Sequence, residues 1–199
     1  MRIGCLFGTF DPPHAAHVAV ARHMRDHAAL DQVWLVVTPE NPFKSGMHRS
    51  PDDHRLAMVR LALMKEDNIL ASGIELDLPR PNYTVDTLSF MRLRFPDDRF
   101  SLIIGSDNLA TFHTWKNAGE ILQHHELLVY PRPGFEEHLR SADLAGHENV
   151  RIISNAPMMD TSSTAIREAI RNWRPVDHLV APQVLSYVRQ HKLYTAKGR

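Results

Sequence analysis

The segment Arg2-Ile-Gly-Cys-Leu-Phe-Gly-Thr-Phe-Asp-Pro-Pro-His-Ala-Ala-His17 joins an apolar run to a turn and to the start of a helical pattern. The run from Ile3 to Phe7 predicts a buried strand that ends at Gly8, and Asp-Pro-Pro is typical of a tight turn. His14 and His17 stand three residues apart, so they share a helix face and can converge on one ligand. Because a helix N-terminus also offers unpaired N–H groups and a partial positive charge, the segment predicts a site for a nucleoside triphosphate.

Apolar runs and helical patterns alternate along the rest of the chain. Further strands are predicted at 33–37, 100–104, 127–130 and 150–153, with a weaker candidate at 69–71. Helices are predicted at 15–27, 51–64, 84–95, 118–124, 161–172 and 182–191. For the second of these helices, Ser50 is the expected N-cap and Pro51 the expected first helical residue. This alternation predicts an α/β fold with a doubly wound parallel sheet.

In such a fold ligands bind at the carboxyl ends of the strands, where the strand order reverses. Each polar motif of this sequence follows a predicted strand, at 8–9, 38–44, 105–107, 131–134 and 161–167. Nothing in the composition marks a linker or an internal repeat. We therefore expect one domain over residues 1–199, with a small helical C-terminal extension from about residue 160.

Composition excludes several classes of protein. The 199 residues include 23 basic and 23 acidic side chains, a balance that argues against a general nucleic-acid binder. No apolar run approaches the ~20 residues of a membrane span, and the chain enters a strand without a signal peptide, so we expect a cytoplasmic protein and no membrane partner. The single cysteine, Cys5, allows no intramolecular disulfide and is expected in the core.

A second motif, Asp160-Thr-Ser-Ser-Thr-Ala-Ile-Arg167, places three hydroxyls at a helix start and an arginine one turn later. Taken alone it fits an N-cap followed by an exposed arginine. The same groups also bind phosphate oxygens, through hydroxyls, free N–H groups and a bidentate guanidinium.

Both motifs resemble signatures of the nucleotidyltransferase superfamily. Residues 8–17 are similar to G-x-F-x-P-x-H-x-G-H, with Ala16 where glycine is usual, and residues 161–167 to I-S-S-T-x-I-R, with Thr161 where isoleucine is usual. The resemblance implies a Rossmann-like nucleotidyltransferase fold. It also implies catalytic roles for His14, His17 and Arg167. The ATP-binding residues that it implies are Gly8, Thr9, Phe10, Ser162, Ser163 and Thr164.

A third group resembles bacterial nicotinate mononucleotide adenylyltransferases. Residues 81–88, Pro-Asn-Tyr-Thr-Val-Asp-Thr-Leu, are similar to P-S-Y-T-x-D-T-L of that family. The resemblance implies that Thr84 contacts the pyridine carboxylate and that Trp115 stacks on the ring, although Trp115 could also be a packing residue. It places Asp107 and Arg132 beside ATP. Lys44, at the end of Asn-Pro-Phe-Lys, is implied to point at a phosphate, and the C-terminal 187–194 segment to be structural.

The activity implied by these resemblances is transfer of AMP from ATP to nicotinate mononucleotide, giving deamido-NAD and pyrophosphate. Mg²⁺ is expected with the ATP phosphates, and two histidines without a third ligand do not make a zinc site. Alternatives are the same chemistry on nicotinamide mononucleotide, with one or both acceptors used, or on phosphopantetheine or a phospho-sugar. From a different class, a nucleotide-sensing module without turnover is a further alternative. The sequence leaves the oligomeric state open.

Overall fold

The computed structural model of this chain describes residues 1–40, 49–135, 144 and 146–195. The strands are β1 (Arg2–Gly8), β2 (Gln32–Val37), β3 (Ile69–Ser72), β4 (Arg99–Gly105), β5 (Leu127–Tyr130) and β6 (Val150–Ile152). The α-helices are α1 (Ala15–His27), α2 (Asp52–Ala62), α3 (Thr84–Arg94), α4 (Ser106–Leu109), α5 (Ala118–His124), α7 (Ser163–Arg171) and α8 (Pro182–Gln190). Two 3₁₀-helices are η2 (Ile74–Asp77) and η3 (Phe112–Thr114).

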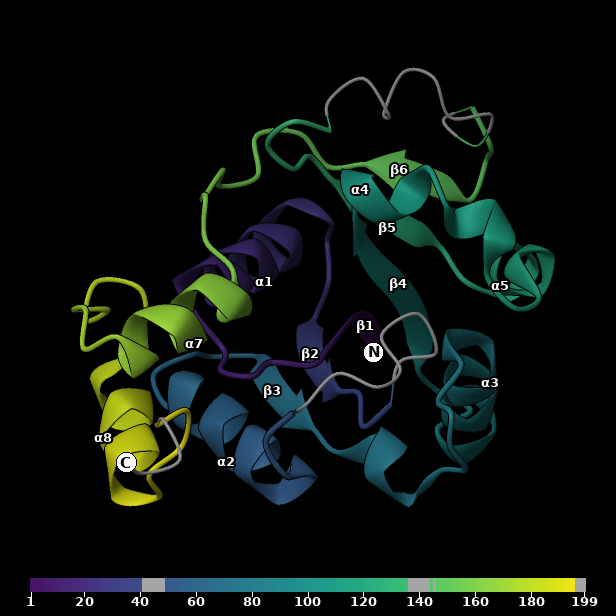
Figure 1. The fold of residues 1–199 in the computed structure, drawn as a ribbon. Coiled ribbons are helices and arrows are strands. Elements are labelled where there is room, and N and C mark those ends of the chain that lie inside the picture. The colour runs from purple at the N-terminus through teal and green to yellow at the C-terminus, as the bar shows by residue number, and fades with distance from the viewer. Residues whose placement is uncertain (41–48, 136–143, 145, 196–199) are drawn as a thin grey trace.

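The strands form one parallel sheet in the order β3-β2-β1-β4-β5-β6 (Figure 1). The chain moves outward from β1 to β3 and then returns to pair β4 with the other edge of β1. This reversal between β1 and β4 is the topological switch point, where ligands of doubly wound sheets bind. The predicted fold class is confirmed, and the weak strand candidate near residue 69 is β3 at the sheet edge.

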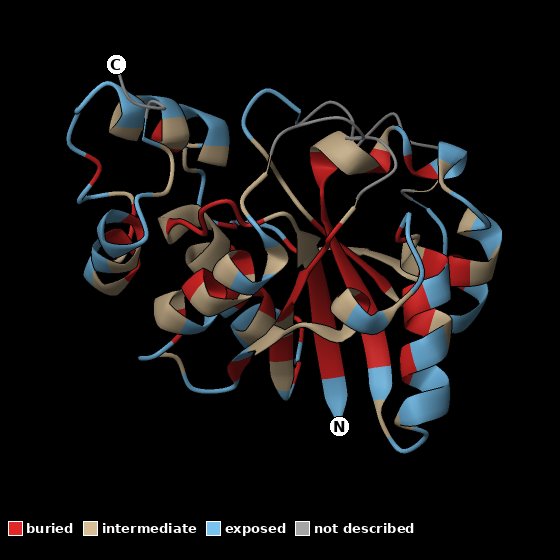
Figure 2. Ribbon diagram, turned by 60° about the horizontal axis from the view of Figure 1, so that its bottom comes forward, coloured by how far each residue is buried: buried red, intermediate tan, exposed pale blue. Residues whose placement is uncertain are grey.

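Two apolar layers cover the sheet, because side chains alternate between its faces along each strand. Leu35 and Val37 of β2 join a core cluster with Met24 of α1, whereas Val36 joins a second cluster with Leu88 of α3. The central strands are accordingly buried over most of their length (Figure 2). Cys5 lies in this core with no exposed surface, as its place in an apolar run predicted.

The C-terminal helices pack on the first half of the chain. A third core cluster joins Met58 of α2 to Ile166 of α7 and to Val184 and Val188 of α8. Figure 1 shows α7 and α8 on the side of the sheet that carries α1 and α2. The C-terminal extension therefore packs on the same side of the sheet as α1 and α2, and it contacts the loop that follows β1.

Two predicted helix starts are wrong by one or two residues. Pro51, and not Ser50, is the N-cap of α2, and the backbone N–H of Ser50 donates to Asp11 Oδ2 at 3.1 Å. The second predicted start, at Thr161, lies before the helix, which begins at Ser163 with Ser162 as N-cap. For α7 the hydrogen bond from the Ala165 N–H to Ser162 marks the boundary, whereas α2 begins without a side-chain cap. The sequence analysis also missed α4, η2 and η3, which are too short to show a periodic pattern.

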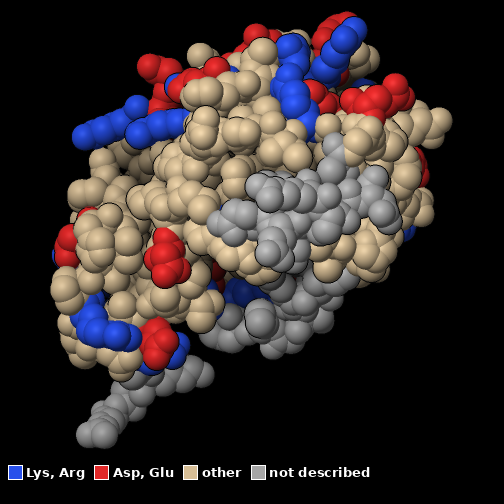
Figure 3. Space-filling view, turned by 90° about the horizontal axis from the view of Figure 1, so that it is seen from above, with Lys and Arg blue, Asp and Glu red and all other residues tan. Residues whose placement is uncertain are grey.

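On the face shown in Figure 3, acidic and basic side chains are interspersed over a mostly uncharged surface. The equal numbers of acidic and basic residues, 23 of each, fit this distribution. Among the described residues, no helix is long and apolar enough to span a membrane.

Candidate active site

The loop after β1 is shaped by the packing of one aromatic side chain. Phe10 has a φ of 48°, in the left-handed region, and its side chain is buried in the core. A Cβ on Gly8 would lie 2.7 Å from the Phe10 ring, so glycine is required for the ring to fold back over the strand end. The same ring meets the His17 ring edge-on, with 4.9 Å between centroids. Phe10 thus fixes the loop and one histidine, and only its backbone is left to meet a ligand.

The two motif histidines form a stacked pair at the start of α1. His14 is the N-cap residue, and its ring lies 3.7 Å from that of His17, centroid to centroid. The backbone N–H of His14 donates to Nδ1 of His17 at 3.2 Å. In neutral His17 the proton must therefore be on Nε2, which makes that nitrogen a donor. The structure brings the pair together as the spacing predicted.

Burial keeps His14 uncharged. Desolvation, and secondly the positive charge of Arg132, lower the pKa of His14 to about 4. Nδ1 of His14 is buried and has no hydrogen-bond partner among the residues that the structure describes. At neutral pH the side chain is a neutral imidazole, which can donate one hydrogen bond without adding charge.

The expectation of unpaired N–H groups at the start of α1 needs a correction. The backbone N–H of Ala15 donates to the carbonyl oxygen of Leu179 at 2.8 Å. The first amide of the helix is therefore satisfied by the C-terminal extension, and any anion at this helix must use later amides or the histidine side chains.

The second motif contacts the first one directly. Nη1 of Arg167 donates to the carbonyl oxygen of Asp11 at 2.7 Å, and Oγ of Ser163 donates to that of Pro12 at 2.9 Å. Within α7, Thr164 Oγ1 accepts from Nη2 of Arg167 at 3.2 Å. Segments about 150 residues apart in the sequence thus meet at the loop that ends in His14. The structure places both motifs in one site.

Ser162 has a local role in the structure. Its Oγ accepts the backbone N–H of Ala165 at 3.2 Å, which is N-cap geometry. The hydroxyl hydrogen is not needed for that bond, so the same group can still donate to an oxygen outside the helix. The N-cap interpretation and the phosphate-binding interpretation are therefore compatible.

Asp107 and Arg132 meet across the ends of β4 and β5. Their ion pair has an Nη1–Oδ2 distance of 2.8 Å, and the backbone N–H of Arg132 donates to Oγ of Ser106 at 2.9 Å. A Cβ on Gly105 would lie 2.4 Å from Oδ1 of Asp107 and 2.6 Å from Cδ of Arg132. The ion pair can form in this position only because residue 105 is a glycine and has no Cβ. The positive charge of Arg132 also helps to lower the pKa of His14.

The residues expected at the acceptor lie around the start of α3. Thr84 is the first residue of α3, and Trp115 follows η3, half-buried, with its ring centroid 5.3 Å from that of Phe112. The next residue, Lys116, lies 4.5 Å above the Tyr83 ring and pairs with Asp86 of α3. The Trp115 and Thr84 segments are therefore neighbours.

A surface pocket of about 400 Å³ lies beside these segments. Residues 78–83 line most of it, together with Asp86, Thr87 and Lys116, so it adjoins both Thr84 and Trp115 in the sequence. Lys44, the remaining acceptor-side residue, lies outside the described residues. No group of three or more His, Cys, Asp or Glu side chains in the described ranges is arranged to hold a metal ion.

The sequence analysis missed a buried arginine, Arg55 of α2, which contacts the loop that carries Thr9. The available signal was that Arg55 shares a helix face with Met58 and Val59, three and four residues later, but an exposed arginine at the edge of that face gives the same pattern. It also missed Glu75, a buried carboxyl that accepts from Thr87 Oγ1 at 2.6 Å and whose pKa is raised by burial.

Fold and site together define a class of nucleotide-binding transferase, and comparisons with known proteins agree. Residues 5–169 match the family model described as cytidylyltransferase-like. The chain is 41% identical over 194 residues, 98% of its length and 99% of the relative, to the "Probable nicotinate-nucleotide adenylyltransferase" of Flavobacterium johnsoniae. It is 37% identical to the protein of the same name from Bacteroides thetaiotaomicron, covering 96% and 92% of the two chains. The chain therefore belongs to the cytidylyltransferase-like family, among its nicotinate-nucleotide adenylyltransferases.

Solved structures support the fold. The Plasmodium falciparum nicotinic acid mononucleotide adenylyltransferase complexed with NaAD superposes with a TM-score of 0.80, covering 97% of each chain at 18% identity. A putative nicotinate-nucleotide adenylyltransferase from Vibrio parahaemolyticus gives a TM-score of 0.70 at 19% identity, over 97% and 94% of the two chains. At these identities the likeness concerns the arrangement of the elements.

Proposed function

We propose that this enzyme transfers AMP from ATP to nicotinate mononucleotide, giving deamido-NAD and pyrophosphate. The observation that carries the proposal is the docking of Arg167 and Ser163 onto Asp11 and Pro12, immediately before His14. This contact brings the side chains of both motifs together beside the carboxyl end of β1, and that juxtaposition supports a shared role in binding phosphates. The names of the bacterial relatives support the same reaction.

In this mechanism the 5′-phosphate oxygen of the mononucleotide attacks the α-phosphorus of ATP in line. An ionised phosphate needs no general base, so catalysis consists of positioning and of stabilising developing charge. His17 would donate from Nε2, and neutral His14 would donate its one imidazole N–H. Both donors are held by stacking and by the bond between His14 N–H and His17 Nδ1, which limits their reorganisation during the reaction.

The leaving pyrophosphate would be held at the start of α7. Arg167 has five N–H donors, and its contacts with Asp11 and Thr164 use Nη1 and Nη2 once each. The remaining donors can meet phosphate oxygens, together with the hydroxyls of Ser162, Ser163 and Thr164. Because α7 begins in the C-terminal extension, the proposal treats residues 1–199 as one domain.

The nucleotide itself would lie along the ends of β1, β4 and β5. Gly8, Thr9 and Phe10 would contribute backbone groups, since the Phe10 side chain is buried. Asp107 and Arg132, paired through a 2.8 Å contact, would face the nucleotide from the other side. Mg²⁺ keeps several of its waters and binds through substrate phosphates, so it would enter with ATP and neutralise charge on the phosphates.

The acceptor would lie beside α3. Thr84 at the helix start would meet the pyridine carboxylate, and the indole of Trp115 would stack on the electron-poor ring. Lys44 would point at a phosphate. Recognition of a carboxylate by N–H groups favours the acid over the amide, because the amide nitrogen cannot accept.

The experiment that tests the proposal measures pyrophosphate release with ATP, Mg²⁺ and either nicotinate or nicotinamide mononucleotide. We expect strong preference for the acid. Equal rates would make the enzyme dual-specific and remove the role given to the carboxylate. Turnover with neither, but with another phosphate acceptor such as phosphopantetheine, would keep the chemistry and replace the substrate. Tight ATP binding without pyrophosphate release from any acceptor would instead indicate a nucleotide-sensing module.

A further inference from the structure

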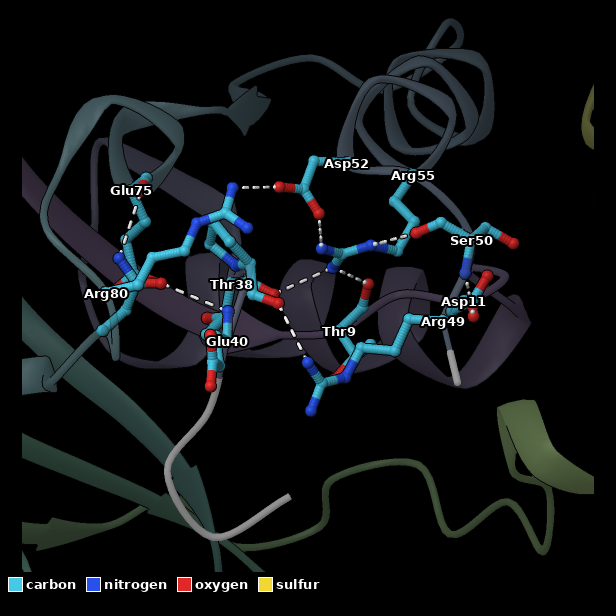
Figure 4. A network of polar contacts seen from close by, with 12 residues as sticks. Thr9, Asp11, Thr38, Glu40, Arg49, Ser50, Asp52, Arg55, Glu75 and Arg80 are labelled. Atoms are coloured by element: carbon cyan, nitrogen blue, oxygen red, sulfur yellow. Dashed lines mark hydrogen bonds and ion pairs between the residues drawn. The ribbon is translucent and has the colours of Figure 1, made fainter. Parts of the chain in front are cut away.

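Arg55 of α2 has no exposed surface, and it binds three different segments of the chain (Figure 4). Its Nη1 donates to the carbonyl oxygens of Thr9 and Thr38, both at 2.8 Å, and its Nε donates to that of Ser50 at 3.2 Å. Its Nη2 forms an ion pair with Asp52. The three carbonyls belong to the loop after β1, the segment after β2 and the residue before the N-cap of α2.

Burying a guanidinium is costly unless its charge is paired and its N–H groups are bonded. Here one carboxylate and three carbonyls meet both conditions, so the arginine is fixed in place. A planar guanidinium can reach several carbonyls at once in a fixed geometry, whereas a lysine ammonium cannot. Arg55 therefore holds the carbonyl of Thr9 beside that of Thr38, next to the direct hydrogen bond from the Thr38 N–H to the Gly8 carbonyl at 2.9 Å.

The ion pair extends to the acceptor side of the site. Asp52 Oδ1 contacts Arg55, and its Oδ2 accepts from Arg80 at 2.5 Å. Arg80 begins the short segment that leads to Thr84. In the same segment, Asn82 accepts the backbone N–H of Glu40 at 3.2 Å and donates its own backbone N–H to the Glu40 carbonyl at 3.0 Å. The segment before α3 is thus attached to both α2 and the end of β2.

We propose that Arg55 and Asp52 are positioning residues that set the distance between the phosphate loop after β1 and the acceptor segment at 80–84. This inference rests on the proposed adenylyl transfer. The pair acts through backbone carbonyls and through Arg80, and not by touching either substrate. Arg55 holds the ATP side, Arg80 holds the acceptor side, and Asp52 is bound to both arginines and joins the two sides.

The acceptor arm is tested with Arg80→Gln and Asp52→Asn. Arg80→Gln removes the guanidinium that binds Asp52. Asp52→Asn keeps a side-chain oxygen that can accept from Arg55 and places the amide NH₂ group beside Arg80. For Arg80→Gln we expect KM for the mononucleotide to rise about fivefold or more, with KM for ATP within about twofold of wild type. Asp52→Asn also removes the charge that pairs with buried Arg55, so in this variant we expect both KM values to rise. Arg22→Gln is the matched control, since it breaks the exposed Arg22–Glu66 pair away from the strand ends and should change neither KM.

The ATP arm is tested with Arg55→Lys, which keeps the charge but cannot bond all four oxygens. We expect kcat to fall about tenfold or more, because the phosphate loop is displaced. If Arg55→Lys fails to fold, the two acceptor-arm variants still decide the proposal. Wild-type KM values in both Arg80→Gln and Asp52→Asn, or an equal rise of both KM values in Arg80→Gln, would overturn it.

Amide hydrogen exchange separates this inference from the proposed reaction. Asp52→Asn should increase exchange at residues 80–84, and Arg22→Gln should not, whether or not ATP and nicotinate mononucleotide are the substrates. Increased exchange in an enzyme inactive toward nicotinate mononucleotide would contradict the proposed substrate and keep the positioning pair. Unchanged exchange in an enzyme that is active toward nicotinate mononucleotide would contradict the positioning pair and keep the proposed substrate.

Discussion

The phenol of Tyr194 donates a 2.6 Å hydrogen bond to Oδ1 of Asp11, a residue 183 positions earlier in the chain. Asp11 is buried, and its other carboxylate oxygen accepts the backbone N–H of Ser50. Its carbonyl accepts from Arg167. Three distant segments therefore hold the residue that leads into the histidine motif.

Tyr194→Phe tests whether the C-terminus supports the site. The variant keeps the ring but leaves Oδ1 of buried Asp11 without its donor, a change that typically costs ~1–3 kcal/mol. We expect the free energy of unfolding to fall by that amount and KM for ATP to rise. Tyr187→Phe is the control, because its hydroxyl bonds to His54, away from the phosphate loop. An unchanged KM for ATP in Tyr194→Phe would limit the contact to stability.

His17→Ala tests the proposed phosphate donor. We expect kcat to fall at least about a hundredfold, equivalent to ~2.7 kcal/mol, with the fold intact by circular dichroism. His27→Ala, an exposed histidine at the other end of α1, serves as the control and should retain wild-type kcat. Near-normal turnover in His17→Ala would remove the role assigned to this side chain.

The pH dependence of stability should report the burial of His14. Its pKa is about 4 in the folded protein, against 6.5 for an unperturbed histidine. As pH falls from 6.5 toward 4, the unfolded state binds a proton that the folded state does not, so stability is lost across this window, by up to ~3 kcal/mol. Urea unfolding of wild type and of His14→Asn between pH 7 and pH 4 measures this. Parallel curves for the two proteins would show that His14 contributes nothing.

Gly105→Ala tests the Asp107–Arg132 pair. The new Cβ would collide with Oδ1 of Asp107 and Cδ of Arg132, both closer than 3.0 Å. We expect kcat/KM for ATP to fall about tenfold or more, since the pair must move. Gly119→Ala in α5 is the matched control: its Cβ meets nothing within 4 Å. That variant should keep full activity and gain up to ~1 kcal/mol of stability from helix propensity. Equal activity of both variants would show that the pair is not needed.

Much of this architecture follows from local patterns. The run from Ile3 to Phe7 is apolar because β1 is covered on both faces, and the helix that begins beside His14 is amphipathic. Short elements were missed because η3 and α4 span less than a full periodic pattern. Ser50 was wrongly taken as an N-cap: α2 begins one residue later than predicted, with Pro51 as its N-cap.

Local patterns were sufficient to predict the order of strands and helices along the chain, the turn at Gly8 and two polar motifs that resemble phosphate-binding signatures. These depend on residues close together in the chain, whose periodicity and backbone preferences are readable. The hydrogen bonds that Arg167 and Tyr194 each donate to Asp11, and the burial of Arg55, could be recognised only in the folded structure. Each depends on segments brought together by packing of the sheet and α7, and a side chain's partner across such a distance is fixed by the folded geometry and leaves no local pattern.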